Sequence, residues 1–331
     1  ATATDSNGGE LKIEYSVDGE NWTTDNETIT AKDVADSKTV PNQTFNAEAT
    51  EKPAAIEGYT PVSTAKQSIN IGVSENKIVF YYYKNVTLNA NSATELYDGS
   101  AHSVEGFAIS GELPAHKADF SAIKVGANGT NAATYPANFA NGTVGKIDAT
   151  KKYIVVAANN GTLTINPRKV VLTSESAQKQ YDGTALTRPD VTVEGTFVEG
   201  EVSDVKATGT ITEIGSVVNT IVFTAGAAFD ARNYEIVKRE GKLEITASEK
   251  ELKVVANSNS WTYDGQDHAD GGYTVTYGTE TYTVKAGESA TLSTGDTVTA
   301  TITKTVKNVS ETATGNNEIV ELTITNRAQY T

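Results

Sequence analysis

The chain has 331 residues, no cysteine and no methionine, and a formal charge of −15 from 42 acidic and 27 basic residues. Its length suggests two to four domains, and the missing cysteines exclude disulfides, thiolate metal sites and cysteine nucleophiles. The negative charge, with no basic cluster against it, argues against nucleic-acid or anionic-membrane partners. No secretory signal or membrane-spanning run is visible, and without an initiator methionine the chain reads as an excerpt of a longer protein.

The first 84 residues predict a small β domain. In "LKIEYSVDGENW" the apolar residues from Leu11 to Val17 alternate with polar ones, which is the period of a half-buried strand, and Asp18-Gly19 predicts a turn. The segment "AKDVADSKTV" from Ala31 suggests a short helix. The run "KIVFYYYKN" from Lys77 is apolar on both faces, which predicts a strand in the centre of its sheet.

The rest of the chain repeats a Tyr-Asp-Gly triplet, which starts at Tyr97, Tyr181 and Tyr263. The period of about 80 residues suits a tandem array of small domains. Each triplet follows an alternating strand, and each unit closes on another. The opening strands are predicted at 85–90, 168–174 and 250–256, and the closing strands at 161–167, 241–247 and 320–326.

Short links connect these strands. The links "ANNG" and "REG", which precede the closing strands at 161–167 and 241–247, predict hairpin turns. The segment "TINPRKVVL" connects one unit to the next almost without a linker, and Pro167 is its only strand-breaking residue. This predicts a semi-rigid rod.

The triplet itself is interpreted as a structural turn. Aspartate can accept a bond from the backbone that follows it, glycine supplies a positive φ, and tyrosine has a ring to bury and a hydroxyl to anchor. The alternatives are a Ca²⁺ ligand at the aspartate, although no D-x-D-x-D-G loop surrounds it, and catalysis. The predicted turn residues are Tyr97, Asp98, Gly99, Tyr181, Asp182, Gly183, Tyr263, Asp264 and Gly265.

No motif of a serine hydrolase, zinc protease, nucleotide-binding loop or dinucleotide-binding fold occurs, so no enzymatic activity, cofactor or metal is expected. "DGQDHAD" surrounds His268 with Asp264, Asp267 and Asp270, which could hold a metal, but an exposed acidic loop is the preferred interpretation. Lysines of first strands, such as Lys169, raise the alternative of a Lys–Asn isopeptide crosslink.

Aromatic residues could stack on sugar rings, although core or cross-strand packing is the more common use of each ring. The candidates are Trp22, Tyr59, Tyr81, Tyr83, Trp261 and Tyr273.

Two resemblances to bacterial surface modules follow from these motifs. The pair Gly58-Tyr59 and the strand 79–82 resemble a MucBP module, the mucin-binding-protein repeat. Residues 85–327 resemble the "mostly β-grasp" (MBG and YDG) repeats through the triplet and through Asn233, Tyr234 and the closing "GKLEI". The third repeat departs most, because its end lacks the tyrosine and the proline.

We therefore expect four small tandem domains in an elongated rod, mainly β and β-grasp-like, with a minor α component. Their predicted bounds are 1–84 (MucBP-like), 85–167, 168–248 and 249–331 (MBG/YDG-like). The resemblance implies a monomeric, extracellular, non-enzymatic stalk and adhesion segment anchored in a Gram-positive cell wall. Its implied partners are mucin, host or plant glycans, or a host surface protein. The alternative is a carbohydrate-binding region of a surface or secreted glycan-degrading enzyme.

Overall fold

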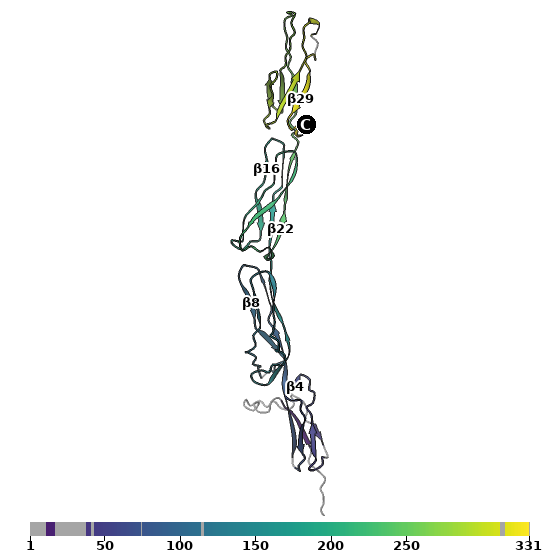
Figure 1. Ribbon diagram of the computed structural model, residues 1–331, viewed down its shortest axis with the longest axis vertical. Helices are drawn as coiled ribbons and strands as arrows, with labels where there is room; N and C mark the ends of the chain where they lie inside the picture. Colours follow the sequence, from purple (N-terminus) through teal and green to yellow (C-terminus); the bar gives the residue numbers. More distant parts are fainter. Residues whose placement is uncertain are drawn as a thin grey trace, which may run out of the picture. The chain divides into compact units, whose positions relative to one another are not determined.

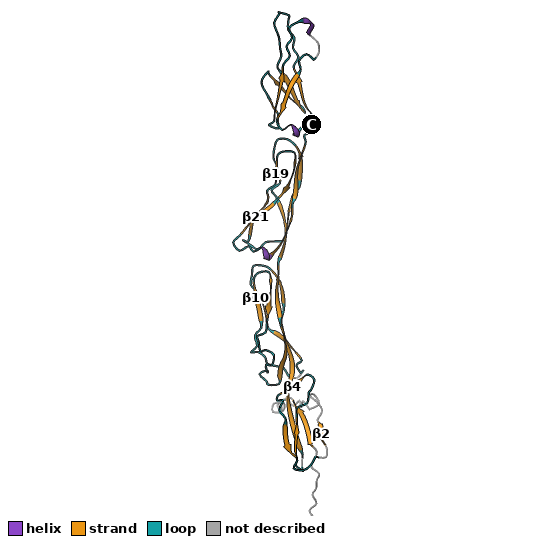
Figure 2. Ribbon diagram, turned by 45° about the vertical axis from the view of Figure 1, so that its right-hand side comes forward, coloured by secondary structure: helices purple, strands orange, loops and turns teal. Residues whose placement is uncertain are grey.

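The structure is a computed structural model. It describes residues 11–16, 38–40, 43–73, 75–113, 116–311 and 315–330. This part consists of strands joined by turns and loops, and its helical structure is confined to the 3₁₀ turns η2 (Ala231–Asn233), η3 (Val309–Glu311) and η4 (Arg327–Gln329) (Figure 2). The prediction of a mainly β chain is confirmed, and the described residues contain no α-helix of the kind a β-grasp fold carries.

The helix suggested for 31–40 was wrong at its end, since Lys38–Val40 form strand β2. Its remaining residues lie outside the described part of the chain, as does the turn predicted at Asp18-Gly19. No helix in the described part is long and apolar enough to cross a membrane.

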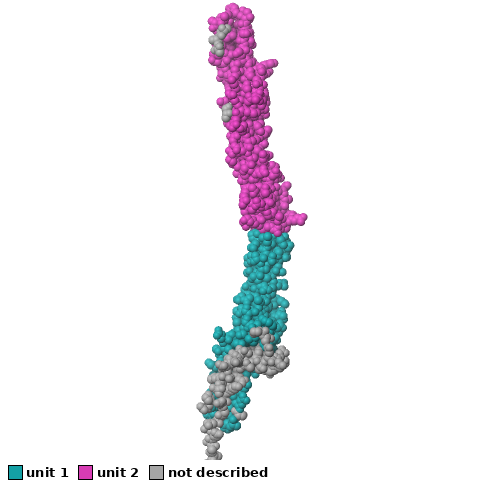
Figure 3. All heavy atoms as spheres, turned by 180° about the vertical axis from the view of Figure 1, so that it is seen from behind, with its two compact units in different colours: residues 1–167 teal, residues 168–331 magenta. Residues whose placement is uncertain are grey.

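The chain divides into two compact units, residues 1–167 and residues 168–331 (Figure 3). The predicted division into four domains is finer than these two units and stays a prediction.

Strand β6 (Asn76–Ala90) is the central strand of the first unit (Figure 1). It pairs in parallel with β1 (Leu11–Ser16) and β12 (Tyr153–Asn159), and antiparallel with β4 (Tyr59–Pro61) and β9 (Phe107–Ser110). Strand β1 also pairs with β2. The prediction of a central strand at this position is therefore confirmed.

This strand contributes residues to two hydrophobic cores, one from each half of its length. Phe80 and Tyr82 lie in the first core, and Val86 and Leu88 lie in the second. Between them, Lys84 pairs with both neighbouring strands. The boundary predicted between residues 84 and 85 thus falls inside a continuous strand, with buried residues on both sides of the partly buried Lys84.

The other strands of the first unit form small sheets. Strand β13 (Gly161–Asn166) lies between β7 (Ala93–Leu96) and β11 (Ala133–Ala137). The remaining pairs are β3 (Glu48–Glu51) with β5 (Gln67–Asn70), and β8 (His102–Glu105) with β10 (Gly126–Gly129).

The first half of the second unit repeats this arrangement. Strand β14 (Arg168–Ser174) lies between β17 (Val191–Glu194) and β22 (Tyr234–Arg239), and β23 (Gly241–Thr246) lies between β15 (Ala177–Gln180) and β20 (Gly215–Asn219). The parallel pairs β14·β22 and β15·β23 correspond to β6·β12 and β7·β13. Two smaller pairs are β16 (Leu186–Thr187) with β19 (Thr210–Ile211), and β18 (Val202–Ala207) with β21 (Ile221–Ala225).

The second half of this unit is connected differently. Its two three-stranded sheets are antiparallel throughout: β24 (Leu252–Ala256), β25 (Tyr273–Tyr277) and β26 (Glu280–Val284), and then β27 (Ala290–Thr291), β28 (Thr297–Ile302) and β29 (Ile319–Ile324). The closing strand β29 pairs antiparallel with β28, whereas the closing strands β13 and β23 each have a parallel partner, β7 or β15. The third repeat therefore keeps the triplet while its described strands lack the parallel pairs of the other two.

The hairpins predicted at "ANNG" and "REG" were wrong. Strands β12 and β13 belong to different sheets, as do β22 and β23. Each link carries the chain from one sheet into the next. The segment between β6 and β7, or between β14 and β15, crosses between the same two sheets beside it. A Cβ on Gly161 would lie 2.2 Å from the carbonyl oxygen of Asn91, and one on Gly241 would lie 2.3 Å from that of Glu175. Glycine is needed here for close approach of two backbones, not for a hairpin.

We expect Gly241→Ala to destabilise the second unit by about 2 kcal/mol or more, because its Cβ meets backbone atoms that cannot move aside cheaply. Gly72→Ala is the matched control, since its Cβ would meet no atom closer than 3.6 Å. Urea unfolding of both variants measures the difference. Equal midpoints for the two variants would contradict the crossover role of Gly241.

Candidate functional site

All three triplets form the same turn. The aspartate Oδ1 accepts a hydrogen bond from the backbone N–H two residues later, and the glycine has a positive φ. The bonds are Ser100 N to Asp98 at 2.8 Å, Thr184 N to Asp182 at 2.9 Å and Gln266 N to Asp264 at 2.9 Å. The glycine φ values are 83° at Gly99, 76° at Gly183 and 77° at Gly265.

Each aspartate also has a cationic or ionisable neighbour. Asp98 and Asp264 contact a histidine four residues later, His102 and His268, at 3.0 and 2.9 Å. The Lys179 ammonium lies 2.7 Å from Asp182, and hydrogen bonds from Lys179 and then Thr184 lower the pKa of Asp182 to about 2. These carboxylates are committed to their own turns, and the described residues hold no group of three or more histidines and acids that could bind a metal.

The tyrosines of the triplets have different surroundings. Tyr97 and Tyr181 are 3% and 5% exposed, whereas Tyr263 is 63% exposed. The turn is therefore constant among the repeats while the environment of its tyrosine is not.

Tyr181 belongs to a buried cluster in the second unit, which we name the tyrosine–aspartate junction and define as Tyr181, Asp296 and Tyr330. The Asp296 carboxylate accepts hydrogen bonds from the Tyr181 hydroxyl at 2.8 Å and from the Tyr330 hydroxyl. Asn326 Nδ2 and Thr294 Oγ1 also donate to it, at 2.9 and 3.2 Å. The junction joins the second predicted repeat to the third, because Tyr181 comes from the former and Asp296 from the latter.

The Tyr330 ring packs against two hydrophobic clusters of this unit. It lies edge-on to Tyr181 and to Tyr277, with ring centroids 5.8 and 5.5 Å away. Figure 1 shows the end of the chain beside this boundary. The contact is tight, since a Cβ on Gly183 would lie 1.9 Å from the Thr294 carbonyl oxygen.

The residue before Tyr330 adds polar contacts across the same boundary. Gln329 Oε1 accepts from the backbone N–H of Ile214 at 2.7 Å, and its Nε2 donates to Glu213 at 2.7 Å. The backbone N–H of Ser248 donates to the Gln329 carbonyl at 3.0 Å. The boundary between the second and third repeats is therefore held by hydrogen bonds as well as by packed rings.

The junction shifts the pKa values of its members. Burial alone would raise the pKa of Asp296, but the hydrogen bonds from Tyr330, Tyr181 and Asn326 outweigh it and lower that pKa. Burial and the bond to Asp296 raise the pKa of Tyr181 to about 12, and the same two causes raise the pKa of Tyr330.

The aromatic candidates for sugar binding differ in their burial and surroundings. Trp22 lies outside the described residues. The Tyr273 ring is fully buried, with its hydroxyl donating to the Glu288 and Val298 carbonyls, so it offers no face to a sugar. In the first unit, Tyr59 is partly buried, with the Lys84 ammonium 4.3 Å from its ring centroid.

The other three described candidates also keep some exposure. Tyr81 is 41% exposed, and Tyr83, two residues further along β6, is partly buried. Trp261 is 40% exposed and stacks on His268 with ring centroids 5.3 Å apart and an interplanar angle of 15°.

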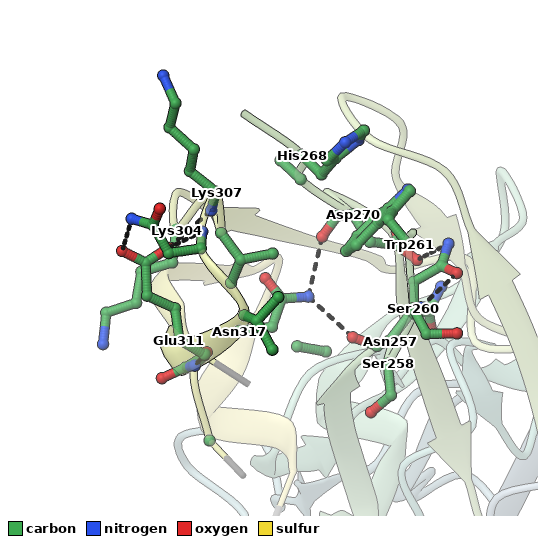
Figure 4. A pocket seen from close by; sticks show the side chains of 18 of the residues that line it. Asn257, Ser258, Ser260, Trp261, His268, Asp270, Lys304, Lys307, Glu311 and Asn317 are labelled. Atoms are coloured by element: carbon green, nitrogen blue, oxygen red, sulfur yellow. Dashed lines mark hydrogen bonds between the residues drawn. The ribbon is translucent and has the colours of Figure 1, made fainter. Parts of the chain in front are cut away.

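Trp261 lines an open depression of about 630 Å³ in the second unit (Figure 4). Residues 255–263 and 268–270 form one wall, and residues 304–311 and 315–317 contribute the other. His268 and Val306 exchange backbone hydrogen bonds of 2.9 Å between the walls. Asn317 Nδ2 donates to the carbonyls of Asn257 and Asp270 at 2.8 and 2.9 Å, which fixes the base of the depression.

Sequence reasoning singled out Trp261 but missed Asp296, Tyr330 and Asn317. Asp296 stands in "LSTGDTV", which reads as an ordinary turn, and Tyr330 follows the last predicted strand in a polar segment. The one available signal was Tyr330 itself, an isolated aromatic residue after the repeat has closed.

Comparison with known proteins gives little further information. No protein-family model matches the chain, and no curated protein matches it. The chain is similar to a solved structure of the Bacillus anthracis TIE protein, with 10% sequence identity and a TM-score of 0.23. The similarity covers 70% of this chain and 50% of that chain, so the chain spans about half the length of that relative. A similarity this weak carries no argument about function.

We expect the stabilising effect of the Tyr181 hydroxyl to depend on pH. The pKa of Asp296 is lowered on folding, so its contribution is complete above about pH 3.9 and is lost as the pH falls through the lower folded value. The pKa of Tyr181 is raised, so its contribution is complete below about pH 10 and is lost as the pH rises through about 12.

Melting temperatures of the wild type and of Tyr181→Phe across this range measure the effect. Their difference should be largest between the two limits and should shrink outside them. Tyr263→Phe is the control in the same motif, because that ring is exposed. A Tyr181→Phe difference that is equal at pH 7 and pH 12 would count against the junction.

Proposed function

We propose that this chain is a non-enzymatic spacer and adhesion segment of a longer, extracellular bacterial protein. The parent protein would be anchored in the cell wall, and this segment would hold its binding head away from the cell. The resemblance to MucBP and MBG/YDG modules supports this proposal, as does the organisation into small repeated β sheets. Its partners would be mucin, host or plant glycans, or a host surface protein, and it would act as a monomer without cofactor or metal.

The observation that carries the spacer role is the continuity between successive modules inside each unit. In the first unit, β6 passes through the predicted 84/85 boundary without a break and contributes to both cores. In the second unit, the tyrosine–aspartate junction bridges the 248/249 boundary. A shared strand and a shared buried cluster leave few free backbone rotations between modules, which is what a stiff spacer requires.

The second candidate is a carbohydrate-binding region attached to a glycan-degrading enzyme. The depression beside Trp261 favours it, because an exposed aromatic ring among amides and hydroxyls suits a sugar. Both candidates use the chain as a binding and spacing segment and leave catalysis to other parts of a parent protein. They differ in what the parent carries.

Small-angle X-ray scattering of the whole chain tests the spacer role. A compact globule of this length would have a radius of gyration of about 20 Å, and a rod of four modules would have about twice that. We expect the larger value in the wild type and a broader distribution of maximal dimension in Asp296→Ala, which removes the shared acceptor of the junction. A radius of gyration near that of the globule would reject the spacer role.

A further inference from the structure

We propose that the depression lined by residues of 255–263, 268–270, 304–311 and 315–317 binds a neutral pyranose sugar, with Trp261 as the ring on which the sugar stacks. This inference rests on the proposed adhesion function and locates one of its contacts. It depends on five features: the shape of the site, the orientation of the aromatic ring, the polar wall, the base formed by Asn317 and the local balance of charge.

The shape and size suit a small glycan. A volume of about 630 Å³ lies within the range of ligand sites, and the depression is open on one side. An open site can accept the end of a chain that continues into solvent. A sugar attached to a larger host glycan has this form.

The Trp261 ring is exposed to solvent, and its orientation is restrained by its neighbours. It is 40% exposed, and its stacking on His268 at 5.3 Å restrains its orientation. His268 is in turn held by Asp264 through its Nε2 and by Val306 through its backbone. A ring fixed before binding loses little conformational entropy when the apolar face of a sugar packs on it.

Polar groups of the same wall flank the ring. The hydroxyls of Ser258 and Ser260 and the amide of Asn259 line the depression. Asn259 Oδ1 accepts from the Ser260 backbone at 2.8 Å, and its Nδ2 reaches Asp270 at 3.4 Å, which orients the amide. Short hydroxyl and amide groups of this kind both donate to and accept from sugar hydroxyls.

The base of the depression is rigid and carries one unmet acceptor. Asn317 Nδ2 bonds to both Asn257 and Asp270, while its Oδ1 is buried and accepts no hydrogen bond from the described residues (Figure 4). This oxygen is closed off from solvent, so Asn317 is not itself a contact for a ligand, and its role is to join the two walls.

The charges at the walls are matched locally. The Lys304 ammonium lies 3.1 Å from Glu318, and the Glu311 carboxylate accepts the backbone N–H groups of Lys307 and Asn308. The whole chain carries a formal charge of −15. The lining contains two lysines, Lys304 and Lys307, and two acids, Asp270 and Glu311, so it has no excess of positive charge to favour a sialylated or sulfated sugar over a neutral one.

Fluorescence titration of the full-length chain tests the site directly. The chain has two tryptophans, Trp22 and Trp261, so Trp22→Phe leaves Trp261 as the single indole reporter. We expect a saturable change in its emission with methyl pyranosides of neutral hexoses or N-acetylhexosamines. Neutral oligosaccharides should act at lower concentration, and sialic acid should give no change. No saturable change with any neutral sugar up to tens of millimolar would overturn the inference.

Binding to immobilised neutral glycans compares the variants. Trp261→Ala should weaken binding at least tenfold, and Phe45→Ala, which removes a similarly exposed ring in the other unit, should leave it unchanged. Melting curves establish that both variants are folded. If Trp261→Ala fails to fold, Trp261→Phe takes its place and should weaken binding less.

The outcomes separate this inference from the proposed function. Glycan binding that survives loss of Trp261 places the contact elsewhere, so adhesion would stand and this site would fall. A preference for sialylated over neutral glycans would also reject the site as assigned. Absence of all glycan binding would reject the inference, while the spacer role would still be decided by the scattering measurement.

Discussion

A buried carboxylate that accepts from two tyrosine hydroxyls holds the second unit together. Asp296 is 5% exposed and receives hydrogen bonds from Tyr181, Tyr330 and Asn326. Such bonds to a charged group contribute about 1.5–3 kcal/mol each, and a buried carboxylate left without donors would be strongly unfavourable. The second and third repeats are therefore coupled, since each supplies groups that the other needs.

The first unit reaches a comparable coupling by a different means. Strand β6 runs through both of its cores, so the backbone itself is the connection. Both units also contain paired strands that cross together from one sheet to the next, and Gly161 and Gly241 stand at equivalent points of these crossings. Repetition in the sequence thus marks positions where backbones approach closely, as well as positions of turns.

The sequence predicted what depends on local pattern. Period-two alternation located the opening and closing strands, and the chemistry of Asp-Gly located three turns whose bonds agree to within about 0.1 Å. It failed where two distant segments decide the outcome. A short polar link looks the same whether it closes a hairpin or crosses between sheets, so "ANNG" and "REG" were misinterpreted. Likewise, the triplets at Tyr181 and Tyr263 look alike, yet one tyrosine meets Asp296 and the other meets solvent.

The same difference explains which part of the candidate site could be found in advance. Trp261 and Tyr273 were both named as aromatic residues that could stack on a sugar, yet Trp261 is 40% exposed and Tyr273 is fully buried. Burial depends on strand pairing, and Tyr273 lies on the inner face of β25 between β24 and β26. Asn317 could not be found, since its role arises only when the two walls of the depression are brought together.

The coupling of the repeats through Asp296 is the central claim, and a double-mutant cycle between Tyr181→Phe and Asp296→Asn tests it most directly. Free energies of unfolding would be measured for the wild type, both single variants and the double variant. The account predicts a coupling energy of about 1–2 kcal/mol, because each substitution removes the same interaction. Strictly additive effects of the two substitutions would show that the tyrosine and the aspartate act independently, and would contradict the account.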